Sequence, residues 1–281
     1  MFVALEAGTG RDIDARVTAA EAAGFVFVTL SDTPGTGIDA GVRAAFLARR
    51  TSRIGLLPQL HVTVTEPFHL ATQLASLDHA SQGRAGWLVG ADNSPAAYAT
   101  VGEPRLDDGD LHRETTDVID VARLLWDSWQ DDAILRDTTT GRFLDADRVH
   151  HVNFTGARFT VSGPLITPRP PQGQVIVAGP DTLGVTGHLD IALVAATGTD
   201  EITARAHRAR ADGAALVFAD LPEVDTGLLD RLAGVVDGVR LLAAVPDVDL
   251  PAVAAAIGPR PPARDTLRAT LGLTRPASQF A

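Results

Sequence analysis

The stretch TEPFHLATQLASLDHASQGRAGWLVGAD, Thr65–Asp92, contains one complete structural unit and decides the fold. Pro67 suits the first turn of a helix, and residues 67–80 follow with helical spacing of their apolar positions. Gln82-Gly83 breaks this helix, and the apolar run 84–89 predicts a buried strand. The final Gly-Ala-Asp lies where that strand would open into a loop, and such loops are where binding sites are found.

The same alternation of helix and apolar strand continues along the chain. Apolar runs without polar alternation predict strands at 2–7, 25–30, 53–60, 84–89, 175–178, 191–196, 214–219 and 239–245. Helical spacing predicts helices at 13–23, 38–49, 67–80, 110–129, 182–188, 200–211, 226–236 and 251–257.

Strands that are apolar throughout and separated by helices indicate a parallel sheet covered on both faces. Eight such units in 281 residues fit an α/β fold, the (β/α)8 TIM barrel, with residues 1–281 as a single domain. A doubly wound open sheet is the alternative. That fold normally has fewer strands and a G-x-G-x-x-G turn after the first one, which AGTGRD at 7–12 lacks. We therefore predict the barrel.

Residues 130–174 interrupt the alternation. They are polar, show little helical period and end in PRPPQG. Within them Val152, Phe154, Phe159 and Val161 alternate on both sides of Thr155-Gly156, which predicts a β-hairpin. We expect this excursion to lie on the rim of the barrel, between its fourth helix and fifth strand.

Composition excludes several classes of function. The net charge is −11, the basic residues are all Arg and form no cluster, so neither nucleic acid nor an anionic membrane surface is an expected partner. There is no Cys, which excludes disulfides, thiolate metal sites and a cysteine nucleophile. No signal peptide and no run of about 18 apolar residues is found, so we expect a cytoplasmic protein.

In a barrel of this type the active site lies at the carboxyl ends of the strands. VIVAGPDTLG at 175–184 combines a strand, a Gly turn and the start of a helix, and free backbone N–H groups there would favour an anion such as phosphate. The alternative is that Asp181 or Thr182 only caps the helix. A carboxylate at Asp181 would also occupy the position of the phosphate unless it turned away.

Two histidines are candidate contacts for a substrate or cofactor. His61 would lie at the end of the third strand and His112 at the start of the fourth helix. Their spacing does not form a set of three convergent ligands, so we predict no metal. The absence of a G-x-S-x-G elbow argues against Ser/His/Asp catalysis.

Several blocks together resemble the luciferase-like flavin monooxygenases, in the branch of nitrilotriacetate monooxygenase, pristinamycin synthase and dibenzothiophene-sulfone monooxygenase. The blocks are TEPFHLATQLASLDHASQGRAGW, ARVTAAEAAGFVFVTLSD, LLWDSWQDDAILRD, GRFLDADRVHHVNFTGARFTVSGPLITPRPPQGQVIVAGP and TLRATLGLTRPASQF. The resemblance implies a barrel that uses O₂ and reduced FMN, delivered by a separate reductase, to oxygenate a small organic substrate. Other members of the superfamily use the deazaflavin F420. A homodimer is also implied.

The resemblance further implies a cofactor site at the ends of the third and fourth strands. Thr63 is retained where the family has a threonine near the flavin ring, and His61 would lie beside it. The family reads W-N-V-V-T-S at the fourth strand, whereas this chain places Leu88 at the Asn position and Ala91 at the Thr position. Gly90 and Ala91 would then line the site.

At the phosphate end the family positions are also changed. Leu111 and His112 stand where the family has an Arg-Tyr pair, so His112 would replace the tyrosine or act as an acid or base. Asp181 stands where a serine meets the phosphate, and Gly179 and Thr182 would offer it N–H and hydroxyl donors.

Two readings of these changes stay open. In the first the chain is a flavin-dependent oxidoreductase with an altered pocket, using FMN or F420. In the second it keeps the barrel without a cofactor and serves as a binding or partner subunit. The chain is shorter than this branch usually is, and the missing stretch falls before TLRATLGL, where the family carries a lid-like insertion.

Overall fold

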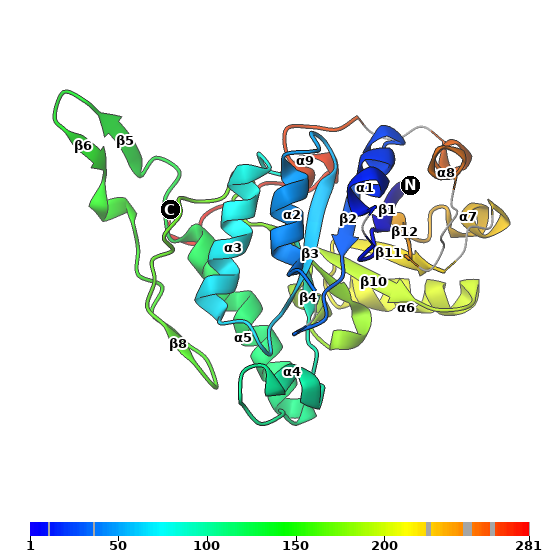
Figure 1. Ribbon diagram of the computed structural model, residues 1–281, viewed down its shortest axis with the longest axis horizontal. Helices are drawn as coiled ribbons and strands as arrows, with labels where there is room; N and C mark the ends of the chain where they lie inside the picture. Colours follow the sequence, from blue (N-terminus) through cyan, green and yellow to red (C-terminus); the bar gives the residue numbers. More distant parts are fainter. Residues whose placement is uncertain (11, 36, 223–225, 244–248, 259–261, 281) are drawn as a thin grey trace.

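The computed structural model describes the chain except for residues 11, 36, 223–225, 244–248, 259–261 and 281. Eight parallel strands close into a barrel in the order β1-β12-β11-β10-β9-β4-β3-β2, which confirms the predicted (β/α)8 fold (Figure 1). The barrel strands are β1 (Phe2–Glu6), β2 (Phe27–Leu30), β3 (Gly55–His61), β4 (Gly86–Gly90), β9 (Ile176–Pro180), β10 (Ile191–Ala195), β11 (Leu216–Leu221) and β12 (Gly238–Leu241).

Helices surround the barrel, and most lie where the apolar spacing predicts them. Local capping explains several of their starts. Glu66, the residue before α3, accepts hydrogen bonds from two backbone N–H groups in the first turn of that helix. Asp107, the residue before α5, accepts one in the same way. The helices are α1 (Ile13–Ala22), α2 (Ala40–Ala48), α3 (Pro67–Ala80), α4 (Pro95–Ala99), α5 (Asp108–Asp127), α6 (Thr199–Ala211), α7 (Thr226–Leu232), α8 (Leu250–Ile257) and α9 (Leu267–Thr270). None of the helices in the described part of the chain is both long and apolar enough to span a membrane.

The helix predicted at 182–188 is wrong. Two 3₁₀ turns stand there instead, η2 (Asp181–Leu183) and η3 (Thr186–His188). Gly184 between them has a φ of 75°, a left-handed conformation that ends a right-handed helix. The predicted strand 239–245 is also shorter, since it ends at Leu241 and residues 244–245 lie outside the described part of the chain.

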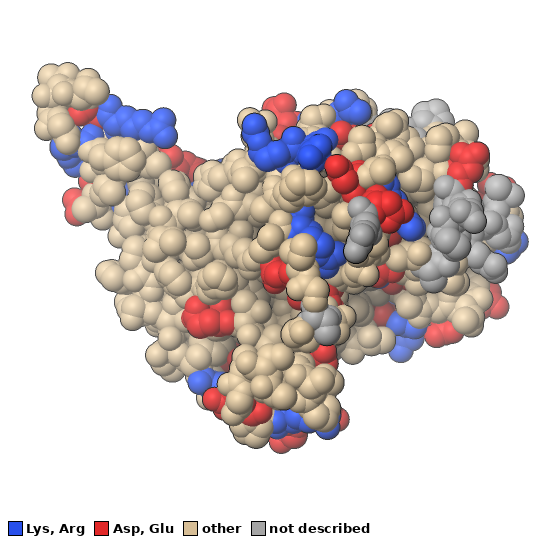
Figure 2. Space-filling view, in the orientation of Figure 1, with Lys and Arg blue, Asp and Glu red and all other residues tan. Residues whose placement is uncertain are grey.

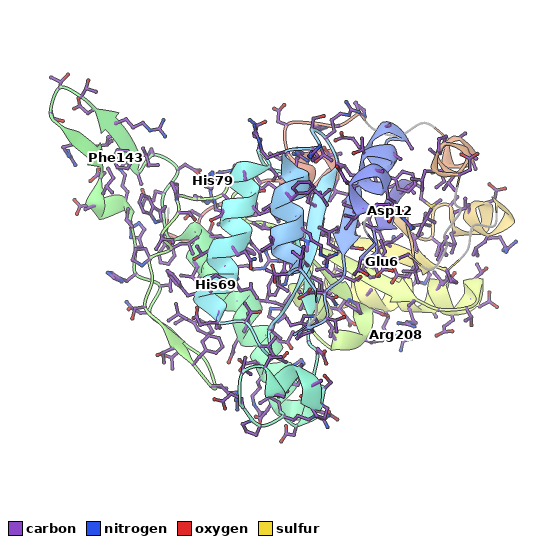
Figure 3. All side chains as sticks on the ribbon, in the orientation of Figure 1. Glu6, Asp12, His69, His79, Phe143 and Arg208 are labelled. Atoms are coloured by element: carbon purple, nitrogen blue, oxygen red, sulfur yellow. The ribbon has the colours of Figure 1, made fainter. Side chains whose placement is uncertain are left out.

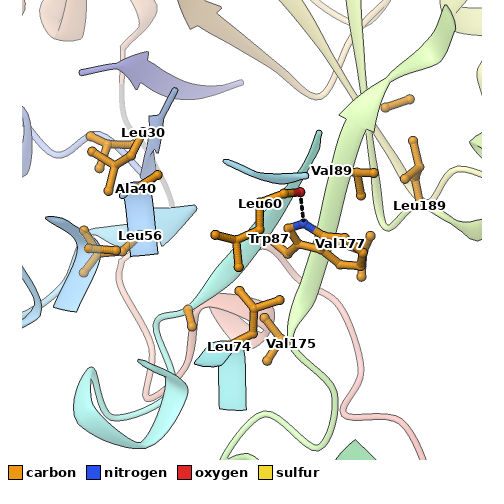
Figure 4. Packing of buried hydrophobic residues seen from close by; sticks show 14 of the residues in the cluster. Leu30, Ala40, Leu56, Leu60, Leu74, Trp87, Val89, Val175, Val177 and Leu189 are labelled. Carbon is orange, nitrogen blue, oxygen red and sulfur yellow. Dashed lines mark hydrogen bonds between the residues drawn. The ribbon is translucent and has the colours of Figure 1, made fainter. Parts of the chain in front are cut away.

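Two apolar layers hold the barrel together. Between the barrel and its helices, Trp87 is fully buried and its Nε1 donates to the Leu60 carbonyl over 3.0 Å, so its polar atom is satisfied (Figure 4). Inside the barrel a second cluster comes from alternate strand positions, as the two-residue period of a strand requires. Its members include Ala4, Phe27, Leu57, Leu88, Ile176, Ala178, Ile191, Leu193, Leu216 and Phe218.

The C-terminal block TLRATLGL closes the amino-terminal end of the barrel. Leu267 and Leu271 of this block join the interior cluster. Gly55, the first residue of β3, leaves the space they need, because a Cβ there would stand 2.8 Å from the Leu267 side chain. The block that supports the family resemblance therefore serves as the floor of the barrel.

Asp78 of α3 links the C-terminal block to the rest of the molecule through a chain of hydrogen bonds. Its buried carboxylate accepts hydrogen bonds from Gln172 Nε2 at 2.6 Å, from the Gln172 backbone N–H and from the Ala85 backbone N–H. Gln172 in turn accepts from the Arg268 backbone N–H over 2.8 Å. Burial raises the pKa of Asp78 to about 6, although the N–H donors oppose this shift.

The excursion at 130–174 leaves the barrel after α5 and returns at β9. The predicted hairpin is confirmed as β7 (Phe154–Thr155) and β8 (Thr160–Val161), with Phe154 opposite Val161. A second hairpin, β5 (Ile134–Asp137) and β6 (Arg142–Leu144), was not predicted. It projects away from the barrel, and the space-filling view shows it as a separate lobe (Figures 1 and 2).

Candidate functional site

The carboxyl ends of the barrel strands carry a layer of polar side chains that point inward. A residue two positions beyond an interior apolar residue lies on the same face of its strand. Glu6 follows Ala4 in this way, and Figure 3 shows it at the end of β1. We call this set the mouth layer; it consists of Glu6, Thr29, Ser31, Gln59, His61, Asp220 and Arg240.

A buried ion pair forms one side of the mouth layer. Arg240 Nε and Nη2 donate to the two carboxylate oxygens of Asp220 at 2.7 and 2.5 Å, and Nη1 donates to the Thr29 hydroxyl over 3.2 Å. Both charged side chains are only 8% exposed. Removing either partner of such a pair typically costs about 3–5 kcal/mol. The pair is therefore a fixed neutral unit and not a free cation for an anionic ligand.

The side chains of Glu6 and Gln59 link the end of β2 to its neighbouring strands β1 and β3. Glu6 accepts from the Ser31 hydroxyl at 2.5 Å and from the Ala243 backbone N–H at 2.9 Å. The Asp32 backbone N–H donates to Gln59 Oε1 over 3.0 Å. Burial, aided by the charge of Asp39, raises the pKa of the Asp32 carboxyl above its ordinary value, while His61 and Arg43 oppose the shift.

His61 lies in the mouth layer with both ring nitrogens engaged. Nδ1 accepts the Asp92 backbone N–H at 3.1 Å, which places the ring proton on Nε2, 3.4 Å from the Asp32 carbonyl. The ring covers Gly90, where a Cβ would stand 2.6 Å from Nδ1. Thr63 donates its hydroxyl to the Asp92 carbonyl over 2.8 Å. His61, Thr63 and Gly90 therefore come together, and their contacts fix the loop after β4. Ala91 in that loop is half-buried against the core.

The end of β9 is occupied by a different ion pair. Asp181 binds Arg205 of α6 through two hydrogen bonds, Nε–Oδ2 at 2.8 Å and Nη2–Oδ1 at 2.5 Å. Hydrogen bonding to Asp181 raises the pKa of Arg205 above its ordinary value. Thr182 is exposed, and a Cβ on Gly179 would lie 3.3–3.4 Å from the Leu183 and Leu189 side chains. The alternative of a helix cap by Asp181 or Thr182 is not found, because η2 begins at Asp181 without a side-chain cap.

His112 belongs to this second group. It is exposed on the first turns of α5, and its Nδ1 lies 3.3 Å from where a Cβ on Gly184 would stand. The predicted residues thus form two groups: His61, Thr63, Gly90 and Ala91 at the ends of β3 and β4, and His112, Gly179, Asp181 and Thr182 around η2. Within the described residues, no cluster of three or more His, Asp or Glu could hold a metal ion.

Sequence reasoning did not assign roles to Glu6, Gln59, Asp220 or Arg240. A signal for them was present, because each is a polar residue at the end of an apolar strand, two positions after an inward-facing residue. Their pairing could not be read from the sequence, since Thr29 and Arg240 are 211 positions apart in the chain and meet only when the barrel closes.

The geometry defines a class: a (β/α)8 barrel with a polar layer at the carboxyl ends of its strands, where enzymes of this fold hold their active sites. The profile of the luciferase-like monooxygenase family matches residues 3–232, and the chain belongs to that family.

Relatives and solved structures agree with this assignment. One of the subunits of pristinamycin IIA synthase from Streptomyces pristinaespiralis is 35% identical over 98% of this chain and 93% of its own length. N-acetyl-S-(2-succino)cysteine monooxygenase of Bacillus subtilis is 42% identical over 47% of this chain, a match that spans 30% of the Bacillus protein. Nitrilotriacetate monooxygenase component A of Aminobacter aminovorans is 40% identical, also over 47% of this chain and 30% of its own length. EDTA monooxygenase from Chelativorans sp. BNC1 superposes with a TM-score of 0.82 over 98% of both chains at 18% identity, which shows a shared fold.

Proposed function

We propose that this chain works in a two-component flavin-dependent monooxygenase, which oxygenates a small organic substrate with O₂ and reduced FMN from a separate reductase. The observation that carries the proposal is the family match over residues 3–232, which includes every barrel strand except β12 and all of the mouth layer except Arg240. Two relatives are by name a component of nitrilotriacetate monooxygenase and a subunit of pristinamycin IIA synthase, so each is part of a larger system, which supports a separate partner. We further propose a homodimer.

The flavin phosphate does not fit at the end of β9. The carboxylate of Asp181 stands there, and Arg205, one of the two arginines that line the small pocket at this end with it, is already bound by Asp181 through two hydrogen bonds. The two 3₁₀ turns also provide no α-helix N-terminus for an anion. We therefore assign no step to a flavin anchored at this position.

The residues of the mouth layer have roles that do not depend on the cofactor's position. His61 is a positioning residue, because its two hydrogen bonds tie the loop after β2 to the loop after β4. The Asp220–Arg240 pair is neutral overall, and the Glu6 carboxylate, held by the Ser31 hydroxyl and the Ala243 backbone N–H, adds a fixed acceptor to the mouth. Such a site suits a small substrate with polar groups that is oriented by hydrogen bonds.

A second candidate function is that of a partner subunit without its own flavin. Two observations favour it: the Asp181–Arg205 pair at the end of β9, and a match that runs nearly end to end with a protein named as one subunit of a synthase.

Flavin titration distinguishes the two candidates. FMN is added to the purified protein and its fluorescence is followed, and O₂ uptake is then measured with reduced FMN and a flavin reductase. Saturable quenching in the micromolar range supports the monooxygenase proposal. Absence of quenching, together with restored activity on addition of a longer family member, supports the partner subunit and overturns the first proposal.

A further inference from the structure

Exposed large apolar side chains gather in two places on the described surface. One stripe consists of Ile38, which precedes α2, and of Val42 and Phe46 on α2; they are 65%, 56% and 52% exposed, and we call them the α2 stripe. Val42 and Phe46 are four residues apart and so lie on one face of the helix, and all three side chains line the same groove. A pair on the β5–β6 hairpin, Leu135 and Phe143, is 40% and 61% exposed. Soluble monomers rarely leave such groupings uncovered without a partner.

The α2 stripe forms one wall of a groove of about 770 Å³. The opposite wall comes from Thr9, Gly10 and Ile13 at the start of α1. The base of the groove is rigid, because Arg43 donates to the carbonyls of Gly8 and Ile38. Most of the exposed lining is apolar, so the groove suits apolar side chains held at a fixed spacing. We call it the α1–α2 groove.

The β5–β6 hairpin presents such side chains. Ile134 pairs with Leu144 and Asp137 with Arg142, so Phe143 faces a bulge that contains Leu135 and Arg136. Arg136 has a φ of 50°, the local irregularity of that bulge. Figure 3 shows Phe143 on this lobe, well away from the barrel. A two-stranded hairpin standing alone is marginal in water, which favours a partner that covers it.

The hairpin and the groove of one molecule cannot meet. In Figure 1 the hairpin lies beyond α3, while the groove lies on the other side of α2, between α2 and α1. A second copy would remove this obstacle, because a two-fold dimer would pair each hairpin with the groove of the other copy and form both contacts at once.

Charge favours the same pairing. Arg136 makes no hydrogen bond or ion pair with any described residue. Asp12 directly precedes Ile13, which lines the groove; Asp12 is exposed, and its side chain does not cap α1. A cation on the hairpin and a carboxylate on the groove thus both lack partners in the described part of a single copy.

We propose that the β5–β6 hairpin of one copy docks in the α1–α2 groove of a second copy, with Leu135 and Phe143 against the α2 stripe and Arg136 facing Asp12. This deepens the proposed homodimer by naming its contact surface, and it does not depend on flavin binding.

The test measures the dimer dissociation constant by sedimentation equilibrium of the full chain. Phe143→Ser should weaken the dimer by at least about tenfold. Arg136→Asp and Asp12→Arg should each weaken it, whereas the double variant with both charges reversed should recover most of the loss. Ile166→Ser is the matched control, since Ile166 is 70% exposed but lies outside the hairpin and the groove, and it should leave the constant unchanged.

Thermal melts followed by circular dichroism confirm that each variant is folded. A dimer that is insensitive to all three single changes would overturn the docking surface while leaving the homodimer intact. A wild-type monomer at all concentrations, or one that pairs only with a longer family member, would overturn both. Concentration-dependent polymers would overturn the reciprocal two-fold arrangement. Flavin titration of the same samples reports separately on the proposed activity.

Discussion

At the scale of single residues, Gly90 and His61 depend on each other. The family resemblance assigns both to the cofactor, but their contacts in the structure are with one another and with the neighbouring loops. Gly90 has no side chain, and this allows the His61 ring to cover it and accept the Asp92 backbone N–H. The mouth of the barrel is therefore shaped by a glycine whose role is to make room for an imidazole.

Gly90→Ala should destabilise the protein by about 1–3 kcal/mol, because the new Cβ would displace the His61 ring and lengthen its hydrogen bond to Asp92. Urea denaturation measures the change in the free energy of unfolding. Gly198→Ala is the control, since a Cβ there meets nothing within 4 Å and the φ is −135°. Equal stability of the two variants would show that the His61 ring is free to move.

Asp78 makes stability depend on pH in an uncommon direction. Burial raises its pKa in the folded state to about 6, above the ordinary value of 3.8. A raised pKa means that the folded state favours the protonated form. The contribution is therefore fully present below the ordinary pKa and is lost as the pH rises through about 6.

The difference in unfolding free energy between the wild type and Asp78→Asn should fall by about 2–2.5 kcal/mol from about pH 4 to about pH 7. Asparagine cannot ionise, so the variant removes this titration while keeping an acceptor for the Ala85 N–H. Urea denaturation at several pH values gives the difference. A difference that is constant with pH would mean that the carboxyl is ionised throughout.

At the scale of elements, the segment after β9 differs from the predicted phosphate-binding turn. Gly184 replaces the predicted helix with two 3₁₀ turns, and α6 supplies Arg205 to neutralise Asp181. The connection is thus held by an ion pair between η2 and α6, at the position where the sequence predicts backbone N–H groups that would favour an anion.

Asp181→Ser should raise the affinity for FMN by about tenfold or more, because it removes a carboxylate that repels phosphate and releases Arg205 to bind it. Fluorescence titration measures the dissociation constant. Riboflavin, which has no phosphate, serves as the control ligand, and its affinity should not change. An equal gain for both flavins would mean that Asp181 affects binding of the isoalloxazine ring and not of the phosphate. No gain for FMN would mean that Asp181 does not limit flavin binding.

At the scale of the whole molecule, the sequence predicts the barrel better than its site. Strands of a parallel barrel are buried on both faces, so each one is a continuous apolar run in the sequence. Eight such runs that alternate with helices are enough to predict the barrel. The bounds of α3 also follow, because Pro67 and the Gln82-Gly83 turn are local signals. Contacts such as Arg240 with Asp220, Asp181 with Arg205 and Leu267 with Gly55 join distant segments, and no local pattern encodes them.

Residues 266–273 close the amino-terminal end of the barrel, so we expect the stability of the whole barrel to depend on them. Leu267 is 2% exposed, packs with the interior cluster, and is held in place by its backbone N–H donating to the Gly83 carbonyl over 2.8 Å. Leu267→Ala should therefore lower the free energy of unfolding by about 2–5 kcal/mol, the range for a buried leucine whose cavity cannot collapse. Urea denaturation measures the loss, and Ile166→Ala, an exposed apolar position, should change stability by less than about 0.5 kcal/mol. If both variants lost the same small amount, the terminal block would be an appendage and the barrel would close without it. A large loss at Leu267 alone would show that strands from the start of the chain are packed against its end, so that the barrel folds as one cooperative unit.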